Sequence, residues 1–471
     1  MASKINLGRS TSWTLIWIVF KTSMRFVSNM ILSRLLSPEM FGIAAIGNAI
    51  LSGVSMLSDI GLRQSIVRSH REDDTFFKTA WSIQIVRGII LWMLLSLMAA
   101  PLGYFYGSTE VTTFVLIVAI TLLSMGLNNV EVHRRFRDSN LRVIALMDIT
   151  ATIIGLSVMV FWATIQPSSV ALAVGALVTT SIMTALTLII LPKANCRLMF
   201  DKETVRELIS FGKWIFISTI LAFFVIQLDR LVLGKLVSLQ EVGFYSIAAI
   251  WAFIPNQILG QWSGQVFFPL VAESVRSQTG IHVLRFTRRV YVAIAALACA
   301  VLFAASELII GLVYPHAYAD VAQLMRPLIA VALITTIEQS YSDLLIAYSI
   351  PKEKVIGQGI SLVIFLALLW PVFNFAGLEG FIFLIGATTA FRCFWFAYRL
   401  RRLFALDIWF DTAFFGLFIG GAYVLLQLND ISGGQLNQMA MVAIQGVSAA
   451  ALSFWLYRKV SRLHTKNQTA I

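Results

Sequence analysis

The chain is dominated by apolar stretches of the length that crosses a membrane. A helix of about 20 apolar residues spans a hydrocarbon core of roughly 30 Å. Such stretches occur about fourteen times along the 471 residues, of which 58% are hydrophobic and only 13% are charged. This composition excludes a water-soluble surface and predicts an all-α, polytopic membrane protein. The predicted spans are residues 12–33, 42–63, 79–100, 111–131, 142–164, 169–191, 213–236, 243–265, 289–313, 323–348, 355–374, 379–398, 410–428 and 437–457.

The basic residues alternate along the chain in a way that predicts its orientation. Lys and Arg in short loops stay preferentially on the cytoplasmic side of a membrane. Most of the 36 Lys and Arg residues lie in every second connection, and the intervening connections hold only Arg34 and Lys235. Both termini are therefore predicted to be cytoplasmic. The formal charge of +12 is interpreted as a topology signal, and no nucleic-acid partner is expected.

Two short outer turns repeat each other. Residues 33–42 read SRLLSPEMFG and residues 234–243 read GKLVSLQEVG, so that Gly42 matches Gly243. Each copy lies between the first and second spans of a block, which predicts two six-helix lobes of equal orientation, an arrangement found in transporters. The predicted domains are an N-terminal six-helix lobe (1–192), a cytoplasmic amphipathic linker (193–212), a C-terminal six-helix lobe (213–402), and two additional helices with a cytoplasmic tail (403–471).

The linker contains an amphipathic segment, DKETVRELISFG, at residues 201–212. Its acidic first turn suits a helix N-terminus, because the helix dipole favours negative charge there. The segment is predicted to lie on the inner membrane surface and to connect the lobes.

The connections offer little room for catalysis. None exceeds about 25 residues, so no aqueous domain is available for a catalytic constellation. The five histidines lack a second histidine at metal-ligand spacing, and no phosphate-binding or nucleophile motif is found. We therefore expect no catalytic residues, no metal and no cofactor, and the protein is predicted not to be an enzyme.

The first span carries a polar face. Lys21 and Arg25 lie near its middle, and a charge in a span costs about 2.5–3.5 kcal/mol on insertion scales. We expect both residues to face a shared cavity; the alternative is an ion pair with an acid on another helix. Residues of the polar face recur every three or four positions, namely Thr14, Trp17, Lys21, Arg25 and Ser28. Candidate acidic partners are Asp59, Asp148, Asp229, Glu338 and Asp343.

The second block contains a different polar set. Its first span holds Gln227, Asp229 and Arg230, and its fourth span holds Thr335, Glu338, Ser342 and Asp343. In the span 243–265, Gln257, Gln261 and Gln265 share a face, and Pro255 is predicted to kink the helix. Amides suit sugar hydroxyls; the alternative for each glutamine is a hydrogen bond between helices.

Three further arginines lie nearer the ends of spans. For Arg87, Arg326 and Arg392, the alternative to a functional role is that the side chain extends towards the membrane interface.

Several of these segments resemble the polysaccharide transporter family. They are LSRLLSPEMFG, SDIGLRQSIVRSHREDD, FYG and HRRFRDSNLRVIALMDI in the first half, and LDRLVLGKLVS with Pro255 and Pro269 in the second half. Members include exporters of O-antigen, colanic acid, succinoglycan and teichuronic acid, in a superfamily shared with multidrug extruders and peptidoglycan lipid flippases. The resemblance covers nearly all of residues 5–402.

The resemblance implies a MATE-like fold and a flippase that moves undecaprenyl-diphosphate-linked oligosaccharide repeat units by alternating access. Fixed positive charge lowers the electrostatic free-energy cost of moving a diphosphate through a low-dielectric core, and the basic first span resembles the cationic cavity of lipid-linked precursor flippases. Candidate substrate-binding residues are Lys21, Arg25, Arg87, Arg230, Gln257 and Gln261. Expected partners are the polyprenyl-diphosphate-linked glycan, membrane lipids, and polymerase and chain-length components of the pathway. The protein is expected to be a monomer in the bacterial cytoplasmic membrane.

Two other functions are alternatives to this one. A cation-coupled multidrug antiporter has the same fold but favours acidic cavity residues, for which Asp229, Glu338 and Asp343 are the ion-coupling candidates. A polymerase or ligase of the same pathway would be expected to carry a long outer loop with catalytic Arg or His residues, and the predicted outer loops are short.

Overall fold

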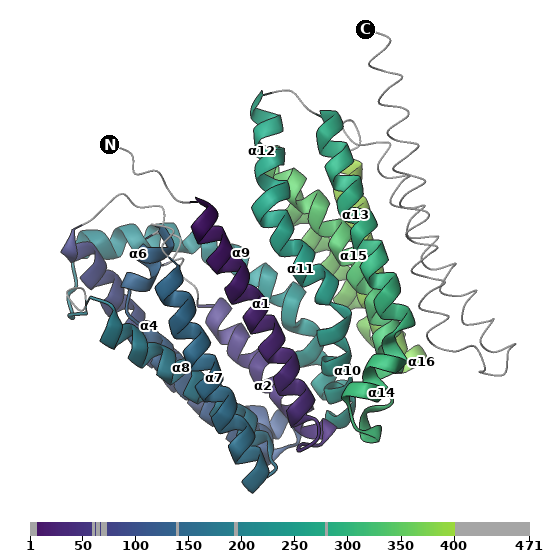
Figure 1. Ribbon diagram of the computed structural model, residues 1–471, viewed down its shortest axis with the longest axis horizontal. Coiled ribbons are helices and arrows are strands. Elements are labelled where there is room, and N and C mark those ends of the chain that lie inside the picture. The colour runs from purple at the N-terminus through teal and green to yellow at the C-terminus, as the bar shows by residue number, and fades with distance from the viewer. Residues whose placement is uncertain are drawn as a thin grey trace, which may run out of the picture. The chain divides into compact units, whose positions relative to one another are not determined.

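The computed structural model describes residues 7–400, except 59–61, 63–65, 67–72, 138–140, 193–195 and 278–280 (Figure 1). These described residues form helices joined by short connections, with no strand among them. The predicted all-α class is confirmed. The last two predicted spans and the region 403–471 lie outside the described residues, so the count of fourteen stays a prediction.

The first six predicted spans each coincide with one long helix. Polar residues and glycine set the ends: the Asp73 carboxylate accepts a hydrogen bond from the Phe76 backbone N–H, and Gly107 ends the same helix with a φ of 69°. A capping aspartate at the start of a helix and a glycine with positive φ at its end are both common. The helices are α1 (Leu7–Leu32), α2 (Pro38–Met56), α4 (Asp74–Tyr106), α5 (Thr109–Leu127), α7 (Arg142–Ile165) and α8 (Ser169–Ile190), with a short α6 (Glu131–Arg137) between α5 and α7.

The amphipathic linker segment and the seventh predicted span form one helix, α9 (Lys202–Leu236). The Asp201 carboxylate accepts a hydrogen bond from the Thr204 backbone N–H at its start. No proline interrupts the segment, so the backbone hydrogen bonds continue from the linker into the span.

Several of the remaining spans are broken. The predicted kink at Pro255 is confirmed: α10 (Leu239–Ala252) and α11 (Ile254–Trp262) meet at an angle of 41°. A π-helix, η1 (Ser263–Phe267), and α12 (Phe268–Ser277) follow. The other elements are α13 (Ile281–Ala304), α14 (Ser306–Val313), the 3₁₀ turn η2 (His316–Tyr318), α15 (Val321–Ala347) and α16 (Pro351–Arg399), which contains the last two described spans on either side of a non-helical Gly377.

Eight of the described helices are long and apolar enough to cross a membrane, or nine when the bent pair α10 and α11 is taken as one span. The helices α1 and α9 match two more predicted spans, but charges such as Lys21, Arg25 and Arg230 lower their mean hydropathy. The helix α16 matches two predicted spans within one continuous element. The chain is a multi-pass membrane protein.

By its internal contacts the chain divides into two compact units, Met1–Ser246 and Ile247–Ile471. In the first unit, α4 packs on α5, α7 on α8 and α1 on α7, while α9 packs on α2 and α4. In the second unit, α15 packs against α16, α13 and α11. The predicted domain boundaries stay a prediction.

The two copies of the repeated turn contact each other within the first unit. A Cβ atom added to Gly42 would overlap the Leu239 carbonyl oxygen, and one added to Gly243 would overlap the Pro38 carbonyl oxygen. Pro38 and Leu239 are the first residues of α2 and α10. Each glycine therefore lies against the other copy's helix start, at the matching position of the repeat, as in an isologous contact.

Candidate functional site

Lys21 of α1 forms an ion pair with Asp148 of α7. The distance from Lys21 Nζ to Asp148 Oδ2 is 2.9 Å, and the Trp17 indole N–H donates to the same oxygen at 2.7 Å. Trp17 is held by packing against a small core of Val132, Ile144, Met147 and Leu191. Lys21 therefore forms the ion pair that was the alternative to a cavity position, and its partner Asp148 is one of the five candidate acids. The predicted role of Lys21 in substrate binding stays a prediction.

Arg25 lies one helical turn beyond Lys21, and its guanidinium is close enough to that of Arg230 for electrostatic repulsion. Arg230 belongs to α9, and its Nη1 donates to the Gln227 side-chain oxygen one turn earlier, at 3.1 Å. Like charges repel more strongly where the dielectric constant is low, so an anion between two such groups is favoured. We call Lys21, Arg25 and Arg230 the cationic site.

The neighbouring acid, Asp229, has hydrogen bonds at both carboxylate oxygens. The Tyr245 hydroxyl donates to Oδ2 at 2.7 Å, and the Arg230 backbone N–H donates to Oδ1 at 2.8 Å. Tyr245 is fully buried in α10 and was not a candidate, because a tyrosine in an apolar stretch gives no sequence signal of its partner. The ion-coupling role of Asp229 stays a prediction.

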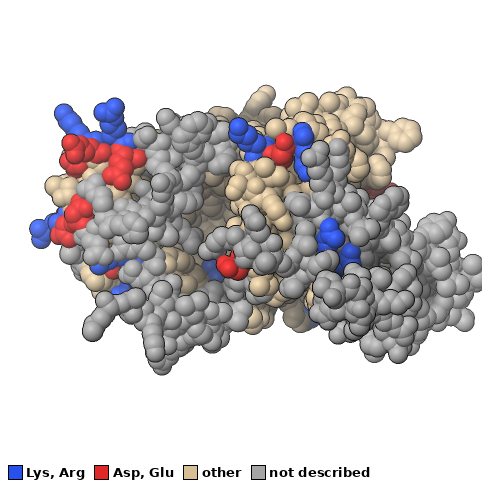
Figure 2. All heavy atoms as spheres, turned by 90° about the horizontal axis from the view of Figure 1, so that it is seen from above, with Lys and Arg blue, Asp and Glu red and all other residues tan. Residues whose placement is uncertain are grey.

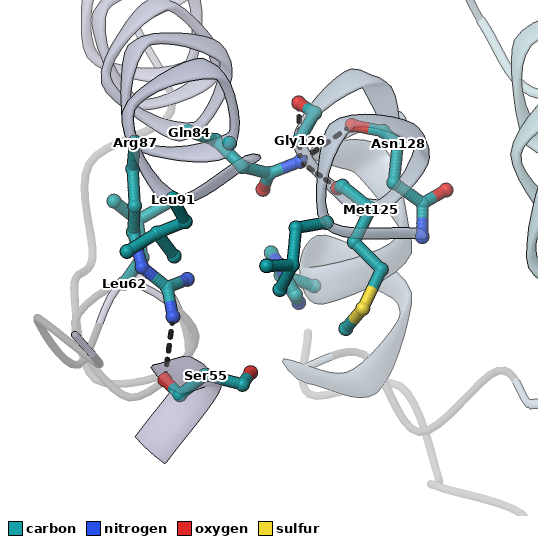
Figure 3. A pocket seen from close by; sticks show the side chains of 11 residues that line it. Ser55, Leu62, Gln84, Arg87, Leu91, Met125, Gly126 and Asn128 are labelled. Carbon is teal, nitrogen blue, oxygen red and sulfur yellow. Dashed lines mark hydrogen bonds between the residues drawn. The ribbon is translucent and has the colours of Figure 1, made fainter. Parts of the chain in front are cut away.

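Arg87 lines a cavity of about 180 Å³ between α2, α4 and α5 in the first unit (Figure 3). Its Nη2 donates to the Ser55 carbonyl oxygen at 2.8 Å and to the Ser58 hydroxyl at 2.9 Å. Opposite it, Gln84 donates to backbone carbonyl oxygens at the end of α5, including that of Asn128 at 2.8 Å. A cation at a helix C-terminus is stabilised by the helix dipole, so Arg87 ties α4 to the end of α2.

In the second unit, Glu338 of α15 lies 3.8 Å from Arg392 of α16, and both are buried. The Arg392 guanidinium also donates to the Thr389 hydroxyl at 3.1 Å and to the Ser361 hydroxyl at 3.3 Å. The interpretation of Arg392 as a side chain extending towards the interface is therefore wrong, since its partners lie inside the helix pair.

Asp343, also on α15, accepts hydrogen bonds at both oxygens. The Ser263 hydroxyl donates at 2.5 Å and the Gln339 amide at 2.8 Å. Ser263 begins the π-helix η1, a rare element that often occurs at functional positions. The ion-coupling roles of Glu338 and Asp343 stay predictions.

The glutamine face of α11 is partly described. Gln257 is half-buried and Gln261 is exposed, whereas the Gln265 side chain lies outside the described residues. The bond from this helix to α15 is made by a neighbour of Gln257: the Asn256 amide donates to the Thr336 hydroxyl at 3.3 Å.

Arg288 lies just before the predicted span 289–313, but the structure places it within a helix. It lies in α13, has no exposed surface, donates to the Ser340 hydroxyl at 3.1 Å and lies 3.9 Å from the centre of the Tyr341 ring. The predicted span began at residue 289, later than α13 itself, because arginines interrupt the apolar pattern in the first turns of this helix. The spacing of Arg285 and Arg288, three residues apart, is the signal that could have shown a helical face.

A family model described as polysaccharide biosynthesis protein matches residues 31–323. The succinoglycan biosynthesis transport protein ExoT of Rhizobium meliloti (strain 1021) is 25% identical over 276 residues, 57% of this chain and 54% of ExoT. The lipopolysaccharide biosynthesis protein WzxC of Escherichia coli (strain K12) is 22% identical over 264 residues, 55% of this chain and 53% of WzxC. The chain thus matches about half the length of these curated relatives.

Solved structures share the fold. The lipid II flippase MurJ in an inward closed conformation has a TM-score of 0.72 at 12% identity, over 94% of this chain and 98% of MurJ. A multidrug resistance MATE family transporter in an inward-facing conformation has a TM-score of 0.65 at 13% identity, over 82% of this chain and 94% of the transporter. These likenesses confirm the MATE-like fold. Because the family model covers more than half of the sequence, the chain belongs to the polysaccharide biosynthesis protein family.

Proposed function

We propose that the protein is a flippase that moves undecaprenyl-diphosphate-linked oligosaccharide repeat units, or a related polysaccharide precursor, across the bacterial cytoplasmic membrane. The observation that carries this proposal is the cationic site on α1 and α9, in a member of a polysaccharide biosynthesis family. The relatives named for succinoglycan transport and lipopolysaccharide biosynthesis support it. The glycan is used for exopolysaccharide, capsule or O-antigen synthesis.

The charge of the substrate matches the charge of the site. Each fixed cation in a span costs about 2.5–3.5 kcal/mol on insertion scales. A diphosphate between Arg25 and Arg230 would remove their mutual repulsion and form charge-assisted hydrogen bonds with both guanidinium groups. Alternating access then carries the charged head across while the polyprenyl chain stays in the bilayer.

Both termini lie on the cytoplasmic side in this proposal. Figure 2 looks down on the view of Figure 1, and basic and acidic side chains gather at its left, on the side of the first unit where α6 lies. The helix α6 contributes the pair Arg134–Glu131, with 3.8 Å between the charged atoms. A charged face supports contact with water and lipid headgroups. The protein acts as a monomer beside polymerase and chain-length components of the pathway.

Deletion of the gene tests the function. Lipid-linked repeat units carrying a radioactive sugar should accumulate on the cytoplasmic side while surface glycan falls, and the plasmid-borne wild-type gene should reverse both changes. Normal surface glycan in the deletion strain, with no accumulation of lipid-linked units, would contradict the proposal.

A cation-coupled multidrug antiporter is the second candidate, because Glu338 and Asp343 are buried acids on one helix. The two functions are separated by vesicles that contain the purified protein. The flippase should translocate undecaprenyl-diphosphate-linked glycan without a cation-driven efflux of dyes, whereas the antiporter should show the reverse.

A further inference from the structure

The two side chains of the Lys21–Asp148 pair differ in exposure and in the number of their partners. The Asp148 side chain is 14% exposed and its Oδ2 atom receives both the Trp17 indole N–H and the Lys21 ammonium. The Lys21 side chain is 51% exposed. The acid is therefore fixed in place by Trp17, whereas about half of the lysine side chain is exposed.

Lys21 keeps a capacity for a second ligand. An ammonium group has three N–H donors, and Asp148 Oδ2 is its acceptor among the described residues. Lys21 and Arg25 are four residues apart on one helix and lie on the same face. An anion held by Arg25 and Arg230 would thus lie within one helical turn of Lys21. The present partner of Lys21 is the Asp148 carboxylate.

A transporter must bind its cargo well enough to load it and weakly enough to release it, as in ion conduction. Three cations close together would hold a diphosphate strongly in a low-dielectric surrounding. A fixed carboxylate beside one of them weakens the binding, because the lysine must leave the carboxylate before it can reach the diphosphate.

We infer that Asp148 is a competing counter-ion for Lys21, which exchanges between the carboxylate and the diphosphate of the carried lipid, while Trp17 keeps the carboxylate in position. Asp148 thereby sets how readily the diphosphate is released. This inference rests on the proposed function.

The experiment measures the dissociation constant of undecaprenyl diphosphate for the full chain in lipid nanodiscs. Asp148→Asn keeps an acceptor for Trp17 but removes the charge, so binding should tighten about fivefold, the factor expected for one partly exposed ion pair. Lys21→Ala should weaken binding, and the double variant should bind like Lys21→Ala. Asp148→Asn should also slow translocation of the lipid-linked glycan.

A matched control is Asp74→Asn. Asp74 pairs with Lys78 at 3.0 Å at the start of α4, and its side chain is 66% exposed. Asp74→Asn removes the same kind of lysine-paired carboxylate outside the cationic site. It should therefore leave the dissociation constant of undecaprenyl diphosphate unchanged.

A second variant keeps the test decisive if Asp148→Asn is unstable. Trp17→Phe removes the N–H that keeps the carboxylate in position, so Asp148 should compete less well for Lys21 and binding should tighten. Unchanged or weaker binding by folded Asp148→Asn, or weaker binding by Trp17→Phe, would overturn the inference alone. Absence of binding by the unsubstituted protein would overturn the proposed function as well.

Discussion

Single charged residues inside the spans differ in how completely they are satisfied. Arg392 is buried with one carboxylate and two hydroxyl groups around it. Arg25 is exposed within the protein and faces the repulsion of Arg230. The first arrangement is that of a buried structural pair, and the second places two like charges near each other.

Substitutions at Arg25 test the second arrangement. Arg25→Ala should leave abundance unchanged while glycan export falls roughly tenfold, as expected for the loss of one charge-assisted hydrogen bond. Arg25→Lys should keep more activity than Arg25→Glu, since the charge is retained. The measurement is surface glycan together with accumulated lipid-linked repeat units. Lys202→Ala, at the exposed start of α9, is the control; full export by Arg25→Ala would remove this residue from the mechanism.

Truncation of Arg392 tests the first arrangement. Arg392→Ala leaves Glu338 buried without its cation and should destabilise the second unit by about 3–5 kcal/mol. Thermal unfolding in detergent measures the loss, and Glu338→Gln in the same chain should restore part of it. Arg326→Ala breaks the more exposed pair with Glu307 and should change stability by less than about 1 kcal/mol. Equal losses for both arginines would contradict this assignment.

The breaks and ends of helices could be predicted where the sequence contains a local signal for them. Pro255 predicted the break between α10 and α11 because proline cannot continue a helix without a kink. The start of α13 could not be placed, because Arg285, Arg288 and Arg289 end the apolar window while the helix itself continues. The continuity of α9 was likewise missed, since a change from amphipathic to apolar pattern does not require a break.

The contact between the starts of α2 and α10 gives a prediction for these elements. Gly42→Ala places a methyl group against the Leu239 carbonyl, and backbone on both sides leaves no room, so stability should fall by about 1–3 kcal/mol. Gly311→Ala in α14 meets nothing within 4 Å and should be neutral or slightly stabilising. Unfolding temperatures of the two purified variants provide the comparison, and equal temperatures would contradict the close contact.

At the scale of the whole molecule, the sequence predicted the all-α membrane class because apolar length and charge alternation are long-range averages that single errors do not erase. The MATE-like fold was predicted from the family resemblance. The sequence also named the charged residues of the cationic site, since charges are conspicuous in spans. It could not select Asp148 among five acids for Lys21, because that choice depends on the packing of α1 against α7.

The orientation of the whole chain is tested by accessibility. In a variant without native cysteines, cysteines at Gln166 and Ser238 should react with a membrane-impermeant reagent added outside intact cells, and those at Arg142 and Lys202 should not. All four positions have exposed side chains. Reaction of both pairs from the same side would contradict the predicted topology.

The reciprocal contact of Gly42 and Gly243 also has a consequence for how such chains diverge. Since each glycine lies against the backbone of the opposite copy, a larger residue at either position is tolerated only if both helix starts move apart. Selection therefore acts on the two codons jointly, although they lie far apart in the gene. Among related genes, the two glycines should be retained together or replaced together, and frequent replacement of one alone would show that the two halves have evolved independently at this contact.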